Sequence, residues 1–114
     1  MNDCIFCKIA AGEIPATVVY EDEYVIAFDD LNPQMPVHTL IIPREHHANI
    51  GDNISDELMG KLFNTVKKIA EIKGIAESGY RVIVNTGDDA QQSVHHIHVH
   101  VLGGAPMNSG SPAL

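Results

Sequence analysis

Apolar side chains recur with helical spacing in two stretches of the chain. A long helix is predicted over residues 55–73, where the apolar positions form one face: Leu58, Leu62, Val66 and Ile69. Ser55 precedes two acidic residues at its expected start, and Gly74 follows its expected end. A shorter helix is expected over residues 3–11, with Asp3 as its N-cap.

Five further stretches are apolar runs or alternate between apolar and polar residues, as β-strands do. They cover residues 17–20, 24–30, 38–42, 80–86 and 96–102. The connections are too short for an all-parallel sheet, so the strands are expected to pair antiparallel. One long helix, one short helix and about five strands predict an α+β fold in which helices back the sheet.

The pattern contains no internal repeat and no linker, so residues 1–114 are interpreted as one domain. Residues 103–114 lack periodicity and are expected to form a loose C-terminal tail. No stretch approaches the roughly 20 apolar residues that span a bilayer, and the first residues do not resemble a secretory signal. We therefore expect a cytoplasmic protein without a membrane partner.

Charge narrows the partners that the chain is expected to bind. Seven Lys and Arg stand against fifteen Asp and Glu, which gives a net charge of −8. This balance argues against binding long nucleic acid, because such binding needs a basic surface. A single nucleotide remains compatible, since histidines and backbone amides can hold its phosphate locally.

Histidines concentrate in residues 95–102, which read His-His-Ile-His-Val-His-Val-Leu. On a strand, His96, His98 and His100 would share one face, and the intervening apolar residues would face the core beneath the long helix. Three imidazoles in register are difficult to explain by packing alone, because buried ring nitrogens need partners. The pattern indicates function, although its spacing fits metal ligation and phosphoryl chemistry equally well.

The neighbouring residues favour phosphoryl chemistry. A largely neutral imidazole can act as a nucleophile at pH 7. Groups able to hold a phosphate are expected nearby: His38, His100, Asn85, Ser93 and backbone amides of the loop before the histidines. Asp30 lies at the end of the second predicted strand and could accept two ribose hydroxyls, although a solvated turn explains it equally well.

These segments together resemble the histidine triad (HIT) family, and within it the Hint branch of nucleoside phosphoramidases. The resemblance rests on the pattern His-φ-His-φ-His-φ-φ at residues 96–102. Further matching segments cover nearly the whole chain: 4–9, 12–15, 27–34, 36–43, 92–94 and 102–104. It implies a homodimer whose two sheets join, and hydrolysis of AMP or GMP esters and phosphoramidates.

The resemblance also implies a role for each matching residue. His98 would attack the α-phosphorus and carry a covalent nucleotide. His100 and His38 would surround the phosphate and the leaving group, and His96 would orient the nucleophile or bind metal. The phosphate would be held, and the leaving amine helped to depart, by Ser93, Asn85 and the Val94 amide. Asp30 would hold the ribose. Six apolar residues would form the purine slot, although ordinary packing also explains them: Ile5, Phe6, Ile9, Ile14, Phe28 and Leu31.

The Cys4-x-x-Cys7 pair resembles zinc-binding members of the superfamily. The resemblance implies a ligand set of Cys4, Cys7, His46 and His96. Such a set is closed and therefore structural, so the chemistry would need no cofactor and the chain would bind at most one structural zinc. The alternative is two buried cysteines and an exposed His46-His47 pair.

The chain departs from the Hint pattern at three places. Ala90-Gln91 stands where two glycines are usual, His95 stands where an aromatic residue is usual, and the tail lacks an aromatic residue found in some relatives. The preference for a leaving group is therefore the property that transfers least. Three alternatives stay open: a dinucleoside polyphosphate hydrolase, a protein whose His98 and His100 bind metal, and a nucleotide-binding adaptor.

Overall fold

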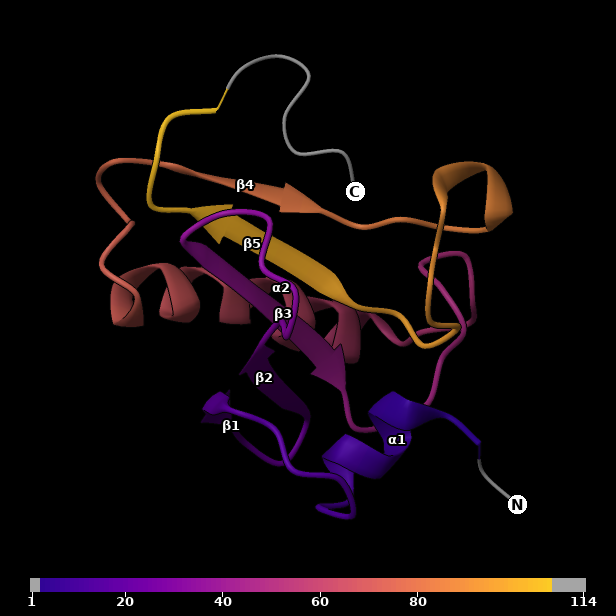
Figure 1. Cartoon of the computed structure of the whole chain (residues 1–114). Coiled ribbons are helices and arrows are strands. Elements are labelled where there is room, and N and C mark those ends of the chain that lie inside the picture. The colour runs from indigo at the N-terminus through magenta and orange to yellow at the C-terminus, as the bar shows by residue number, and fades with distance from the viewer. Residues whose placement is uncertain (1–2, 108–114) are drawn as a thin grey trace.

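A five-stranded antiparallel sheet forms the centre of the protein in the computed structural model, which describes residues 3–107 (Figure 1). The strands are β1 (Val18–Glu21), β2 (Val25–Asp29), β3 (Val37–Pro43), β4 (Tyr80–Ile83) and β5 (Val99–Gly103). They lie in the order β1-β2-β3-β5-β4, and every neighbouring pair is antiparallel. The helices are α1 (Ile5–Ala10) and α2 (Asp56–Ile72), with a 3₁₀ turn, η1 (Asp88–Ala90). The predicted α+β class is confirmed.

The sheet separates two apolar clusters, one under each helix. Leu62 and Ile69 of α2 pack against one face, together with Ile97, Val99 and other strand residues. On the other face, Phe6 of α1 packs with residues of β2 and β3: Ile26, Phe28, Leu40 and Ile42. Because both faces are covered, residues 25–28 of β2 and 40–43 of β3 are continuous apolar runs rather than alternating ones.

The helix ends follow from their capping residues. The Ser55 hydroxyl accepts a hydrogen bond from the Leu58 N–H at 3.1 Å, so α2 begins at Asp56. At α1 the prediction was wrong by one residue, because Cys4 and not Asp3 is the N-cap. The Cys4 sulfur accepts from the Cys7 N–H at 3.4 Å.

Three predicted strands are shorter than expected, and β2 lacks one residue at each end of its predicted range. β4 ends at Ile83, and β5 begins at Val99 rather than at His96. Val99 pairs with Ile41, and the residues before it bond instead to the segment that follows β3. The Ile97 N–H donates to the His47 carbonyl at 2.7 Å. His98 therefore lies just outside the regular strand. Its side chain still faces the side of the sheet opposite to Ile97 and Val99.

The end of β5 corrects the expected start of the tail. Gly103 belongs to the strand, and a Cβ at this position would lie 2.9 Å from Ile75 Cδ1. Residues 108–114 of the predicted tail lie outside the described part of the chain. None of the helices within residues 3–107 has the length and apolar character needed to cross a membrane.

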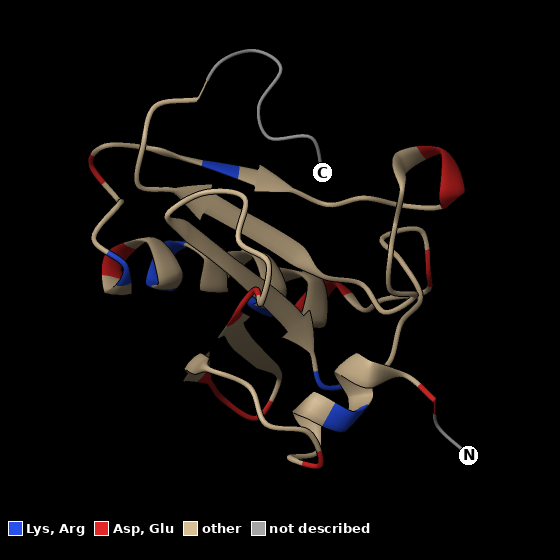
Figure 2. Cartoon of the chain, viewed as in Figure 1, with Lys and Arg blue, Asp and Glu red and all other residues tan. Residues whose placement is uncertain are grey.

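Basic residues are spread over several elements of the fold. Lys and Arg residues are distributed over α1, α2, the end of β3 and β4, with acidic residues between them (Figure 2). Binding of long nucleic acid therefore gains no support from the described residues, and its exclusion stays a prediction.

Candidate active site

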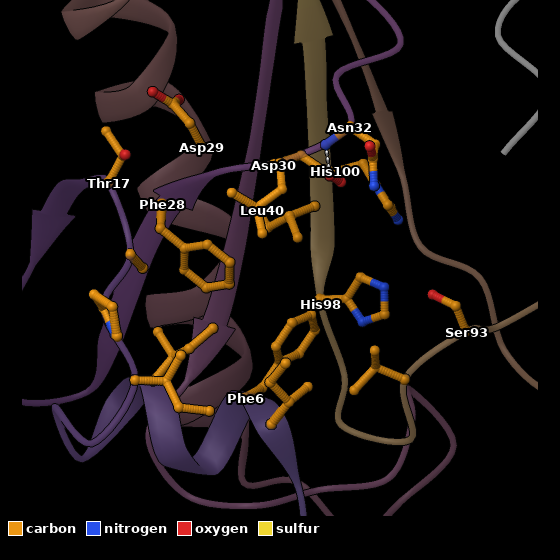
Figure 3. Close-up of a pocket in the computed structure, with 17 residues that line it drawn as sticks. Phe6, Thr17, Phe28, Asp29, Asp30, Asn32, Leu40, Ser93, His98 and His100 are labelled. Atoms are coloured by element: carbon orange, nitrogen blue, oxygen red, sulfur yellow. Dashed lines mark hydrogen bonds between the residues drawn. The ribbon is translucent and has the colours of Figure 1, made fainter.

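A cavity of about 260 Å³ opens on the α1 side of the sheet (Figure 3). All six residues predicted for the purine slot line it: Ile5, Phe6, Ile9, Ile14, Phe28 and Leu31. Its lining also includes the predicted polar residues Asp30, Ser93, His98 and His100. One end of the cavity is therefore apolar and the other carries hydroxyl, carboxylate and imidazole groups, as a site for a small amphipathic ligand does.

The His98 ring has a defined tautomer. Its Nδ1 lies 2.9 Å from the backbone carbonyl oxygen of His96. Because a carbonyl only accepts hydrogen bonds, Nδ1 carries the proton and Nε2 keeps a lone pair. Phe6 packs edge-on against the ring at 5.1 Å between centroids, and the ring extends into the cavity toward Ser93 (Figure 3). The geometry presents an unprotonated nitrogen to a ligand.

A chain of hydrogen bonds defines the protons on His38 and His100. The Gln34 N–H donates to His38 Nδ1 at 3.0 Å, so the His38 proton lies on Nε2. His38 Nε2 is 2.9 Å from His100 Nδ1 and donates to it, which leaves the His100 proton on Nε2. His100 Nε2 is the buried side-chain atom without a partner among the described residues. Such a buried donor indicates that a ligand supplies the acceptor.

Burial keeps these imidazoles neutral near pH 7. It lowers the pKa of His98, and it lowers the pKa of His38 even though the Asp30 carboxylate opposes the shift. Burial and the neighbouring His98 and His38 rings lower the pKa of His100 to about 4. A neutral His98 keeps its nucleophilic lone pair.

Asp30 lies at the rim of the cavity, directly after β2. Its Oδ1 accepts from the Asn32 N–H at 2.8 Å, and its Oδ2 lies 3.5 Å from His38 Nε2. The side chain is partly exposed, so the carboxylate remains able to accept hydroxyl groups. Leu31, the next residue, is 92% exposed and contributes only to the rim of the predicted slot.

The loop between β4 and β5 brings Ser93 and Val94 to the cavity. The Ser93 hydroxyl faces the His98 ring across the polar end (Figure 3). Asn85, predicted to join them, is half-buried and does not line this cavity. The structure therefore brings together Ser93 and Val94 with His98, but not Asn85.

Beside the cavity, Cys4, Cys7, His46 and His96 form a cluster whose ligand atoms all lie within 4.8 Å of one another. His96 Nδ1 is 3.3 Å from Cys4 Sγ, 3.5 Å from Cys7 Sγ and 3.1 Å from His46 Nδ1. His96 Nε2 donates to the Pro43 carbonyl at 2.9 Å, so the Nδ1 lone pair faces the cluster.

These separations suit a tetrahedral metal ion. Zinc bonds of about 2.3 Å to sulfur and about 2.0–2.1 Å to nitrogen place neighbouring ligand atoms roughly 3.3–3.8 Å apart. The observed distances need only small adjustments, and two thiols with two imidazoles are a donor set that zinc prefers. Cys4, Cys7, His46 and His96 therefore fit the structural zinc ion that the resemblance implies.

His98 belongs to neither group of candidate metal ligands in residues 3–107. The second group consists of Asp30, His38 and His100, in which His38 Nε2 and His100 Nδ1 already form a hydrogen bond with each other. The alternative in which His98 and His100 together bind a metal gains no support from this geometry.

Comparison with protein families matches residues 11–107 to the HIT domain. The chain belongs to the HIT family. It is 50% identical over 108 residues to a 14 kDa zinc-binding protein of Zea mays, covering 91% of this chain and 84% of that protein. It is 45% identical over 108 residues to the purine nucleoside phosphoramidase of Escherichia coli K12, and the match covers 93% of this chain and 91% of that protein. The structure of a HIT family hydrolase from Legionella pneumophila superimposes on this one with a TM-score of 0.90 at 48% sequence identity. The superposition covers 95% of this chain and 98% of that chain.

Sequence reasoning on this HIT protein missed the groups that orient the histidines. The Gln34 amide and the carbonyls of Pro43 and His96 are backbone groups, so residue type gives no signal for them. Gln92 was also missed, although its side chain is buried. A polar residue inside a polar loop shows no periodicity that would reveal its burial.

Proposed function

We propose that this HIT protein hydrolyses purine nucleoside phosphoramidates, and related AMP or GMP esters, through a covalent nucleotide on His98. The observation that carries the proposal is the His98 ring, whose Nδ1 proton is held by a backbone carbonyl while Nε2 faces the cavity. The similarity to a phosphoramidase at 45% identity supports the same reaction class.

The first step forms a bond between His98 Nε2 and the α-phosphorus. The P–N bond of the substrate breaks, and its electron pair goes to the leaving amine, which takes up a proton from water through the Ser93 hydroxyl. The His98 ring becomes cationic as it acquires the nucleotide. The His96 carbonyl then accepts from a charged N–H, which strengthens that hydrogen bond and stabilises the intermediate.

In the second step water attacks the same phosphorus. The bond to Nε2 breaks and its electron pair returns to the ring, while the nucleoside monophosphate and a proton leave. His100 Nε2–H donates to a non-bridging phosphate oxygen in both steps, since it is a buried donor without a partner within residues 3–107. His38 keeps His100 in the tautomer that allows this.

The remaining residues bind the nucleoside. The apolar slot beside Phe6 and Phe28 takes the purine, whose faces suit aromatic and aliphatic contacts. Asp30, whose carboxylate is partly exposed and belongs to the cavity lining, accepts the ribose hydroxyls.

Substitution of His98 tests this proposal. We expect His98→Asn to lower turnover of an AMP phosphoramidate at least about 1,000-fold while the protein stays folded, because the asparagine amide has no basic lone pair that can attack phosphorus. His95→Asn is the matched control, since this neighbouring histidine is exposed, and it should retain turnover within about twofold. Wild-type activity in His98→Asn would contradict the mechanism.

We further propose that Cys4, Cys7, His46 and His96 hold one structural zinc ion. The ion would supply a cross-link between α1 and the segments that flank β3 and β5. The name of the Zea mays relative supports this assignment. His96 would thus be a metal ligand whose carbonyl positions His98, rather than a residue that contacts the substrate.

Metal analysis checks the zinc proposal. Wild type and His98→Asn should each contain about one zinc per chain, and Cys4→Ser should lose it, because a site with three ligands binds more weakly. Metal retained in Cys4→Ser, or lost in His98→Asn, would contradict the assignment.

We also propose a cytoplasmic homodimer in which two sheets join. Tyr80 and Val82 support this interface, because they are exposed on the edge strand β4. Sedimentation analysis should give twice the mass of the chain.

A further inference from the structure

One buried side chain holds the loop that carries Ser93. Gln92 is only 6% exposed, although it lies in an irregular segment. Its side-chain Oε1 accepts from the Gly87 N–H at 2.9 Å, and its Nε2 donates to the carbonyls of Ala48 at 2.7 Å and Val94 at 2.9 Å. Both amide protons and the carbonyl are thus bonded to backbone groups in three different places.

These bonds define the shape of the loop. The Gln92 backbone N–H also donates to the Gly87 carbonyl at 3.1 Å. The backbone and side chain of Gln92 thus both bond to Gly87 and hold the two ends of residues 87–92 together. Gln91, directly before it, adopts the left-handed conformation with φ 60° and ψ 39°. The bond to Val94 restrains the backbone on the far side of Ser93, and both Ser93 and Val94 line the cavity.

The bond to Ala48 connects this loop to the segment that also holds His98. His47, the residue before Ala48, accepts the Ile97 N–H through its carbonyl at 2.7 Å. Ile97 directly precedes His98. The hydrogen bonds of the Gln92 amide therefore connect the loop that carries Ser93 to the segment that precedes His98. Gln92 itself does not line the cavity.

We propose that Gln92 is a positioning residue for the reaction at His98. Its amide holds Ser93 and the Val94 amide at the separation from His98 that the α-phosphate and its leaving group require. The inference rests on the proposed function. Small displacements of such groups matter because a misplacement of about 1 Å can cost on the order of 100-fold in rate.

Kinetics of single and double variants with an AMP phosphoramidate test this inference. Gln92→Ala should lower kcat about 10- to 100-fold with little change in KM, since the purine slot is untouched. Gln92→Glu is nearly isosteric and serves if Gln92→Ala fails to fold. It keeps the acceptor for Gly87 but loses both donors, and a comparable loss of kcat is expected. Gln91→Asn is the matched control, because this neighbouring side chain is exposed and asparagine tolerates the same backbone conformation, so kcat should stay within about twofold.

The double variant separates positioning from general stabilisation. Because Gln92 acts in part through Ser93, the loss of kcat in Gln92→Ala combined with Ser93→Ala should be smaller than the product of the two single losses. Losses that multiply, or wild-type kcat in a folded Gln92→Glu protein, would overturn the inference. A failure of the proposed function is distinguishable, because wild type itself would then hydrolyse no phosphoramidate.

Discussion

At the scale of single residues, the site depends on the ring nitrogens that carry protons. His98 is protonated on Nδ1, whereas His38 and His100 are protonated on Nε2, and each assignment follows from a backbone partner or from the neighbouring ring. The histidine pattern predicted the residue types and the face that they share. It could not predict the tautomers, because their partners are backbone groups brought together by folding.

Gln91 is the one non-glycine residue with a positive φ among residues 3–107. An L-residue in this conformation costs about 1–2 kcal/mol, whereas glycine adopts it freely but loses about 0.5–1 kcal/mol of backbone entropy on folding. We therefore expect Gln91→Gly to stabilise the protein by about 0.5–1 kcal/mol in urea denaturation. The departure from the usual glycine thus leaves a measurable strain, and a destabilised variant would contradict this account.

At the scale of secondary structure, apolar periodicity located every helix and strand, and most errors lie at their ends. The predicted strand over residues 96–102 was too long because its first residues bond to the segment after β3. β3 ends at Pro43, which has no N–H to continue the ladder. The pattern of alternating residues could not show this, since Ile97 and His98 still face opposite sides of the sheet before the strand begins.

The N-cap of α2 contributes directly to stability. Ser55 accepts one of the four N–H groups that lack partners at the start of the helix. Ser55→Ala should lower the free energy of unfolding by about 1 kcal/mol, and Ser55→Asp should restore most of it. Thermal or urea unfolding measures both. Because α2 covers the face opposite the cavity, turnover should be unchanged at temperatures where both variants are folded.

At the scale of the whole molecule, the larger apolar core and the candidate active site lie on opposite faces of the sheet. The α2 face is an apolar core, and the α1 face carries the histidines and the cavity. His38 and His100 are distant in sequence, yet the pairing of β3 with β5 places them in contact. The sequence could nominate both residues, but only the register of these strands joins them.

The buried histidines make stability depend on pH. The unfolded chain protonates His100 as pH falls below about 6.5. The folded protein resists this until about pH 4, because burial and neighbouring histidines lower the pKa of His100 to about 4. Stability should therefore fall as pH decreases through this window and be fully present above it. The urea midpoint should be lower at pH 5 than at pH 7, and the difference should be smaller in His100→Gln. An equal difference in the variant would contradict this assignment.

The covalent nucleotide on His98 is the central claim, and rapid-quench mass spectrometry tests it most directly. The protein is mixed with an AMP phosphoramidate, quenched during turnover, digested and sequenced. The account predicts an added adenylyl group on the peptide that contains residues 95–102, located at His98 and absent from His98→Asn. Turnover with no adduct at any time point, or an adduct on another residue, would contradict it.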